Sequence, residues 1–209
     1  MAKKKQRVIT IAATKGGVGK TTVTALLAVR ACQEGRVALI DADSRQGSLL
    51  EWWFLRKEPT NPNLLRVDLS GEGLGLIGSD GWDWMLIDTP PAIIDAISPA
   101  IAIADLVIIP VRPSTIDTLA VAHTIELCVE MSKPYVFLLN ALNPRGQFND
   151  NFRRALRAKG DLLEAEIRHR ETHVNAMMVG KTAPEIEGGA RVCRAEAEAL
   201  WSEIKARVG

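Results

Sequence analysis

Short runs of aliphatic residues alternate along the chain with segments in which apolar residues recur at helical spacing. A run such as Leu106–Val111 is apolar at consecutive positions, which is typical of a strand buried on both faces of a parallel sheet. The aliphatic runs predict strands over residues 8–13, 37–40, 64–68, 84–88, 106–111, 135–139 and 163–167. The helical patterns cover residues 21–34, 47–56, 95–104, 115–131, 150–158 and 189–207. This alternation predicts a doubly wound α/β fold, with a mostly parallel sheet, helices on both faces, and ligands bound at the carboxyl ends of the strands.

The composition is that of a soluble globular protein, since 47% of the 209 residues are hydrophobic and 24% are charged. We expect one domain over residues 1–209. The formal net charge of +1 gives no global basic field, so any affinity for DNA must come from a local patch or from two subunits together. Cys32, Cys128 and Cys193 are far apart, which argues against a zinc or iron–sulfur site and fits a reduced, cytoplasmic compartment. The apolar stretches are too short to predict a signal peptide or a transmembrane helix.

A glycine-rich segment lies between the first predicted strand and the first predicted helix. Strand, glycine turn and helix form the context that a phosphate-binding loop requires, because glycines let successive N–H groups converge on one anion at the start of a helix. Lys20 would reach the β- and γ-phosphates, and the Thr21 hydroxyl would bind Mg²⁺. A glycine turn without a ligand is the alternative, but the motif is full-length and its flanks fit. The expected nucleotide-binding residues are Lys15, Gly16, Gly17, Val18, Gly19, Lys20, Thr21 and Thr22.

Three aspartates lie at the end of a predicted strand or just after one and would face the same edge of the sheet. Asp41 and Asp43 follow the strand at 37–40 and lie two positions apart, so they point to the same side of an extended chain. Beside a phosphate loop, one could order the Mg²⁺ shell and the other could hold the attacking water. Asp88 ends the strand at 84–88 and would bind Mg²⁺. Aspartates at strand ends also cap helices and turns, so a purely structural role is the alternative for each of these residues considered alone.

With Lys15 included, the loop resembles the "deviant" Walker A motif, Lys-Gly-Gly-x-Gly-Lys-Thr, of the ParA/MinD class of ATPases. The resemblance implies that Lys15 reaches across a dimer interface to the nucleotide of the partner subunit, where it acts in catalysis together with Lys20. A cation supplied in this way would neutralise the triphosphate and make dimerisation depend on ATP. A solvated surface lysine is the alternative.

The acidic segments resemble the other motifs of the same class. The segment that begins at Asp41 is similar to the Walker A′ element, Asp-x-Asp-Pro-Gln-Gly-Ser, which implies that Asp43 orients the water and that Asp41 is linked to the metal. The chain departs from that pattern, with Ser44 in place of proline and one extra residue before Gln46. The apolar strand that ends in Asp88-Thr-Pro-Pro resembles Walker B, whose carboxylate holds Mg²⁺, usually through a water molecule.

Two further strand ends carry expectations from the resemblance. The class commonly places an asparagine where Asn140 follows the strand at 135–139, and its amide would hydrogen-bond the adenine edge. Asn143 and Pro144 would line the same pocket. Considered alone, Asn140 is an ordinary turn residue. Arg112 follows the strand at 106–111 and either meets the partner subunit or is solvated.

The resemblance covers nearly the whole chain and implies a small ParA-type ATPase without the N-terminal helix-turn-helix domain of larger members. The expected cycle begins with ATP and Mg²⁺, which close two copies into a homodimer that binds DNA non-specifically. A ParB-like or other activating adaptor then stimulates a slow intrinsic hydrolysis, and the dimer separates. Such a protein would be cytoplasmic, would associate with the nucleoid in its ATP state, and would segregate a plasmid or chromosome or position another cargo.

The DNA contact has one candidate in the sequence. Arg153 and Arg157 share a helical face within a segment rich in basic residues. Such a face is commonly just solvated, and the functional alternative is a phosphate-contacting patch that two subunits combine.

The main rival is a MinD-like ATPase that cycles on membranes through a basic amphipathic C-terminal helix. Here the segment 189–207 places Val192, Ala197, Leu200, Ile204 and Val208 on an apolar face and mixes acidic and basic residues elsewhere, so we expect it to pack on the sheet without stable membrane insertion. A metal-cluster carrier would need paired cysteines, and a bacterial tyrosine kinase typically has a terminal tyrosine cluster, whereas Tyr135 is the only tyrosine.

Overall fold

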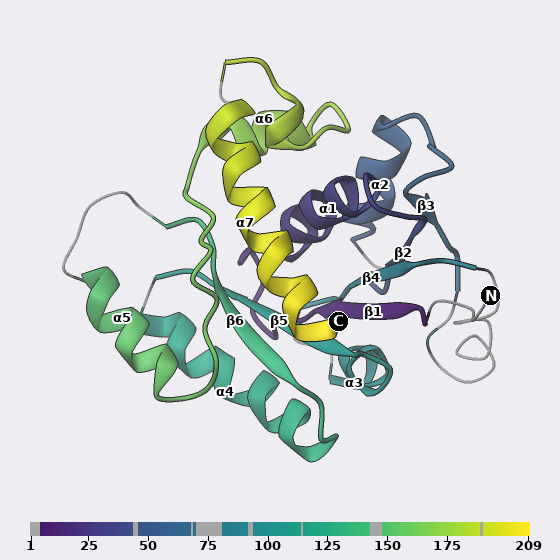
Figure 1. Cartoon of the computed structure of the whole chain (residues 1–209). Helices are drawn as coiled ribbons and strands as arrows, with labels where there is room; N and C mark the ends of the chain where they lie inside the picture. The colour runs from purple at the N-terminus through teal and green to yellow at the C-terminus, as the bar shows by residue number, and fades with distance from the viewer. Residues whose placement is uncertain are drawn as a thin grey trace.

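A six-stranded parallel sheet forms the centre of the molecule (Figure 1). The computed structural model describes residues 5–43, 46–67, 69, 81–91, 94–113, 115–142, 148–188 and 190–209. The strands lie in the order β3-β2-β4-β1-β5-β6, and each neighbouring pair is parallel. Their bounds are β1 Arg7–Ile11, β2 Val37–Asp41, β3 Asn63–Leu64, β4 Trp84–Asp88, β5 Leu106–Val111 and β6 Tyr135–Leu139. This order places the end of β1 between the ends of β4 and β5, so the segments that leave these strands meet at one edge.

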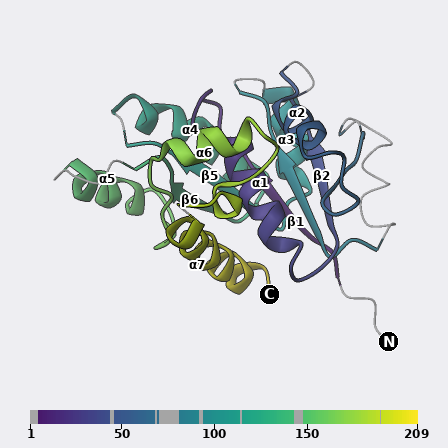
Figure 2. The ribbon, with the colours of Figure 1, turned by 90° about the horizontal axis from the view of Figure 1, so that it is seen from above.

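Helices cover both faces of the sheet (Figures 1 and 2). One apolar core joins the sheet to α1, α2 and α7, and a second joins it to α3, α4 and α5. Alternate strand residues enter opposite cores, as Ile9 and Ile11 pack toward α1 while the Thr10 hydroxyl donates to the carbonyl of Ala100 in α3 at 2.7 Å. The helices are α1 Lys20–Ala31, α2 Ser48–Leu55, α3 Ile94–Ala102, α4 Thr115–Glu130, α5 Phe148–Arg157, α6 Glu171–Met177 and α7 Ala190–Val208, with a short 3₁₀ helix at Ala183–Glu185. The predicted doubly wound fold is confirmed.

The C-terminal helix α7 packs along the α1 face of the sheet. Trp201 is fully buried, and its ring meets that of Trp84 in β4 edge to face, with centroids 4.6 Å apart. The sequence placed Val192 on the buried face, but this side chain is 54% exposed. The buried residues of α7 are Cys193, Ala197, Leu200, Trp201, Ile204 and Val208, a stripe that leaves position 192 outside. No helix within the described ranges is long and apolar enough to cross a membrane.

Replacement of Trp201 with alanine is expected to lower the free energy of unfolding by about 3–5 kcal/mol, because it leaves a cavity between α7 and β4. Urea denaturation followed by far-UV circular dichroism measures the change. Val192→Ala on the same helix is the matched control and should change the free energy of unfolding by less than about 0.5 kcal/mol. Equal effects of the two substitutions would contradict the packing of α7 described here.

Residues 163–167 do not form the predicted strand. Two isolated parallel bridges flank this segment. Leu162, just before it, pairs with Phe137 of β6, and Arg168, just after it, pairs with Leu142. The amides of Glu164 and Ala165 instead donate to the carboxylate of Glu203 in α7, at 3.0 and 2.7 Å. The segment therefore runs beside the edge of the sheet without forming a continuous ladder.

One other prediction needs correction, and two short helices were not predicted. The strand expected at 64–68 is reduced to the two residues of β3, and position 68 lies outside the described residues. Neither α6 nor the 3₁₀ helix after it was predicted. Both are short, and a helix of seven residues shows too few turns to give a recognisable apolar period.

Candidate functional site

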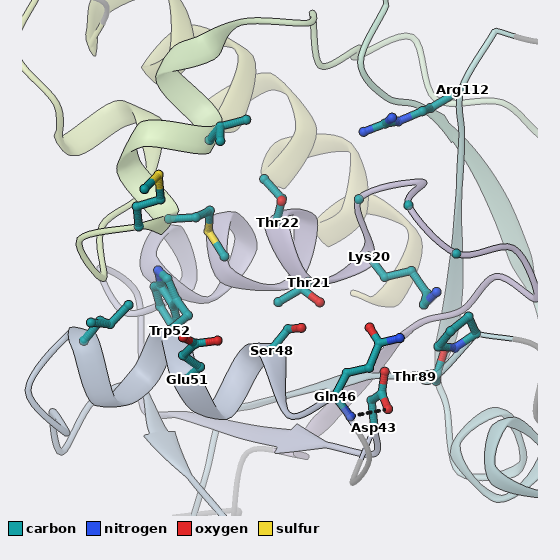
Figure 3. Close-up of a pocket in the computed structure, with 18 residues that line it drawn as sticks. Lys20, Thr21, Thr22, Asp43, Gln46, Ser48, Glu51, Trp52, Thr89 and Arg112 are labelled. Atoms are coloured by element: carbon teal, nitrogen blue, oxygen red, sulfur yellow. Dashed lines mark hydrogen bonds between the residues drawn. The ribbon is translucent and has the colours of Figure 1, made fainter.

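A cavity of about 500 Å³ opens at the carboxyl edge of the sheet, between the loop after β1 and helices α2 and α6 (Figure 3). Its walls come from segments that are far apart in the sequence. Polar groups gather near the end of β1, and apolar side chains line the part near α6. The lining residues are Gly16, Gly17, Gly19, Lys20, Thr21, Thr22, Asp43, Gln46, Ser48, Glu51, Trp52, Leu55, Thr89, Pro91, Arg112, Val174, Met177 and Met178.

The glycine loop, residues 16–19, leads directly into α1. Gly17 and Gly19 have φ values of 73° and 92°, a left-handed conformation that side chains other than glycine rarely adopt. Gly19 is also the residue that caps the N-terminus of α1, so the unpaired N–H groups of the first helical turn lie next to the cavity. This geometry suits an anion.

Lys20 brings a buried cation to the same place. Its side chain is only 7% exposed, and its ammonium group donates to the carbonyl of Lys15 at 3.2 Å. Burial lowers the pKa of Lys20, while the charges of Asp88 and Asp43 act in the opposite direction. The positive charge is thus held near two carboxylates, where it can compensate a phosphate group.

Thr21 and Asp88 form an oxygen-rich pair below the glycine loop. The Thr21 hydroxyl donates to Oδ2 of Asp88 at 2.5 Å, and Asp88 is 2% exposed. Its second oxygen, Oδ1, is buried without a hydrogen-bond partner among the described residues. Burial raises the pKa of Asp88 to about 7, against the hydrogen bond from Thr21, which lowers it. A buried carboxylate oxygen without a partner beside a hydroxyl offers ligands of the kind that Mg²⁺ prefers.

Asp41 and Asp43 have different surroundings. Both oxygens of Asp41 accept backbone hydrogen bonds, from the N–H of Asp43 at 3.0 Å and from that of Leu50 at 2.9 Å. Burial raises the pKa of Asp41, and these two bonds lower it. Asp41 thus ties the turn after β2 to α2, and its predicted link to the metal stays a prediction.

Asp43 itself is at the wall of the cavity. Its Oδ1 accepts the backbone N–H of Gln46 at 3.1 Å (Figure 3), which closes a turn before α2. The negative charge of the Asp43 carboxylate acts to raise the pKa of Lys20. Ser44, where the chain departs from the motif, lies outside the described residues.

Two other predicted residues, Lys15 and Asn140, lie beside the glycine loop and do not line the main cavity. Lys15 does not line the main cavity; it lines a small hollow with Val18 and Thr124. The amide Nδ2 of Asn140 donates to the carbonyl of Val18 at 2.6 Å, so Asn140 lies against the outside of the glycine loop. Asn143 and Pro144 lie outside the described residues.

Sequence reasoning missed the apolar part of the cavity. Val174, Met177 and Met178 come from α6, and Trp52 comes from α2. Arg112 does line the cavity and points toward it from the end of β5 (Figure 3). The sequence predicted that Arg112 meets the partner subunit or is solvated and did not indicate its place at the cavity. Nothing in the local pattern near residue 174 indicated a site either.

Arg153 and Arg157, the two arginines predicted to share a helical face in the basic segment, both form ion pairs with carboxylates. Arg153 forms ion pairs with Asp150 at 2.9 Å and with Glu166 at 2.6 Å. Arg157 pairs with Glu164 at 2.6 Å. The helical face that sequence reasoning considered for DNA is therefore largely neutralised by neighbouring carboxylates.

Comparisons with known proteins show similar chains over nearly the full length. The chain is 32% identical over 216 residues to "Maintenance of carboxysome distribution protein A" of Gloeobacter kilaueensis, covering 93% of this chain and 95% of that protein. The protein of the same name from Halothiobacillus neapolitanus is 28% identical over 214 residues, covering 98% and 99%. The solved structure of Cyanothece McdA in complex with ATP superposes with a TM-score of 0.74 at 19% identity, covering 94% of this chain and 97% of that one.

The family match extends over most of the chain. Residues 9–183 match the CobQ/CobB/MinD/ParA nucleotide binding domain, a range that begins within β1 and contains the other five strands and all the residues that line the cavity. The likeness to the ParA/MinD class that the sequence motifs indicated is thereby confirmed. The chain belongs to the CobQ/CobB/MinD/ParA family of nucleotide-binding domains.

Proposed function

We propose that the chain binds and hydrolyses ATP and that ATP joins two copies into a dimer. The observation that carries the proposal is the cluster at the glycine loop, where a buried lysine lies beside a hydroxyl–carboxylate pair. Lys20 would bind the β- and γ-phosphates, and Asp43 would hold the attacking water. Glycine-loop N–H groups would bind the remaining phosphate oxygens.

The residues present fit a magnesium ion that accompanies the nucleotide. The buried Oδ1 of Asp88 lacks a hydrogen-bond partner among the described residues, and the Thr21 hydroxyl is next to the same carboxylate. Mg²⁺ in nucleotide sites is usually held by one or two such groups and by the phosphates. When bound, the ion would neutralise part of the charge on the β- and γ-phosphates.

A role in positioning a cargo is supported by two relatives that match this chain over almost its full length and are named for carboxysome distribution. We propose that this protein likewise positions a cytoplasmic cargo, with a DNA surface on which its ATP-bound dimer is retained and an adaptor that triggers hydrolysis. The binding to DNA would be non-specific, because it would depend on phosphate contacts.

Lys15→Ala is expected to leave the protein monomeric in the presence of a non-hydrolysable ATP analogue and Mg²⁺, whereas the unmodified protein doubles its mass. The reason is that Lys15 lies outside the main cavity of its own subunit and would act on the nucleotide of the other. Light scattering coupled to gel filtration measures the mass. Lys159→Ala, at an exposed lysine that follows α5, is the matched control and should dimerise normally.

The same samples test DNA retention at about 50 mM and about 200 mM salt. Only the ATP-analogue state should bind, and higher salt should weaken the binding steeply. If the unmodified protein stays monomeric with the analogue, the proposed dimer is wrong. Equal DNA binding with the ATP analogue, with ADP and without nucleotide would contradict the proposed dependence of DNA binding on ATP.

A further inference from the structure

Asn140 connects the end of β6 to the glycine loop, 122 positions earlier in the chain. Its Nδ2 donates to the carbonyl of Val18 at 2.6 Å, and the side chain is 5% exposed. The backbone N–H of Asn140 donates to the carbonyl of Val111 at 2.9 Å, which fixes the base of this side chain to the end of β5. The amide is therefore anchored in the sheet and reaches the loop from a rigid position.

The space for this contact depends on Gly19. A Cβ atom at position 19 would collide with Nδ2 of Asn140, so the amide fills the room that the missing side chain leaves. Gly19 also has a φ of 92°, which a side chain would strain. Conformation and close approach thus both require glycine here.

The hydrogen bond determines which way one peptide group of the loop faces. In a planar trans peptide, the carbonyl of one residue and the N–H of the next point in opposite directions. The single cis bond among the described residues is Asn61–Pro62, so the Val18–Gly19 peptide is trans. Val18 is buried and lines the small hollow, whereas Gly19 lines the main cavity. An amide that holds the Val18 carbonyl outward therefore turns the Gly19 N–H toward the cavity.

We propose that Asn140 is a positioning residue for phosphate binding: it holds the Val18–Gly19 peptide so that the Gly19 N–H faces the phosphates. The inference rests on the proposed ATP site and adds a role that does not involve the base. Without this hydrogen bond the peptide can rotate, and a carbonyl oxygen turned inward would repel a phosphate. The affinity for the phosphate chain should then fall whatever base it carries.

Asn140→Leu tests the proposal, because leucine has nearly the same size and shape but neither donates nor accepts. The affinities for ATP, GTP and inorganic tripolyphosphate are measured by isothermal titration calorimetry. We expect all three to weaken by a similar factor of about ten or more, with the ATP-to-GTP ratio unchanged. Amide hydrogen exchange at Gly19 should accelerate in the protein without nucleotide. Asn151→Leu on α5, where the side chain is exposed, is the matched control and should change none of these values.

Two results would overturn the proposal. Unchanged tripolyphosphate affinity with a reduced ATP-to-GTP ratio would make Asn140 a reader of the base alone, and unchanged affinity for all three ligands would give it no role in binding. If the leucine variant melts at a lower temperature, Asn140→Ala is measured in the same way below its melting transition. Failure of the unmodified protein to bind ATP or tripolyphosphate would instead refute the proposed function.

Discussion

A Lys20→Ala variant is expected to bind ATP at least about a hundredfold more weakly than the unmodified protein. Lys20 is 7% exposed, and its charge faces Asp88 and Asp43. Removing one member of a buried charge cluster costs about 3–5 kcal/mol, and a loss of this size in binding free energy corresponds to a factor of about 10² to 4 × 10³ in affinity. The triphosphate would also meet two carboxylates that no longer have a lysine beside them. Titration with a fluorescent ATP analogue measures the affinity.

Lys181→Ala is the matched control for this loss. Lys181 follows α6, near the apolar wall of the cavity, and its side chain is exposed. The control should bind ATP as the unmodified protein does, and both variants should keep the same far-UV circular dichroism spectrum. ATP affinity within about threefold of normal in the Lys20 variant would show that the buried ammonium group does not hold phosphate.

Much of the polar part of the site could be predicted from the sequence because its determinants are local. Gly17, Gly19, Lys20 and Thr21 belong to one continuous segment between a strand and a helix, and the chain direction alone brings them to the carboxyl edge. Asp88 ends a strand that pairs with β1, so the parallel register places it beside the same loop. Short-range pattern and sheet topology were sufficient for these residues.

The apolar wall could not be predicted, because tertiary contacts hold it in place. Arg56 at the end of α2 donates to the carbonyl of Gly180 at 3.0 Å and pairs with Glu185 at 2.8 Å. The indole of Trp52 donates to the carbonyl of Lys181 at 3.0 Å. These contacts join α2 to the segment after α6 across more than a hundred residues, and no local period in the sequence reports them.

The contact of Asn140 also could not be predicted from the local sequence pattern. A strand-end asparagine indicated the correct edge of the sheet, but its partner, the Val18 carbonyl, is a backbone group that the sequence does not mark. The ion pairs of Arg153 are a further case, since Glu166 neutralises it from a segment that was expected to be a strand. Long-range side-chain partners are therefore the part of this site that the sequence pattern does not indicate.

Asp43→Asn is expected to slow ATP hydrolysis about a hundredfold or more while ATP binding is retained. The amide oxygen of asparagine can still accept the N–H of Gln46, so the turn before α2 should persist. The substitution removes the negative charge and the ability to take a proton from water. Release of phosphate measures hydrolysis, and light scattering with ATP and Mg²⁺ should show a dimer that persists because ATP is not consumed.

Glu51→Gln separates this role from a general effect of charge in the cavity. Glu51 is an exposed carboxylate on α2 that lines the same cavity as Asp43. Both substitutions remove one negative charge from the cavity wall, so a purely electrostatic effect would change hydrolysis similarly in both. Normal hydrolysis in the Glu51 variant and a trapped dimer only in the Asp43 variant would assign the water-orienting role to Asp43. Normal hydrolysis in the Asp43 variant would leave that role to another group.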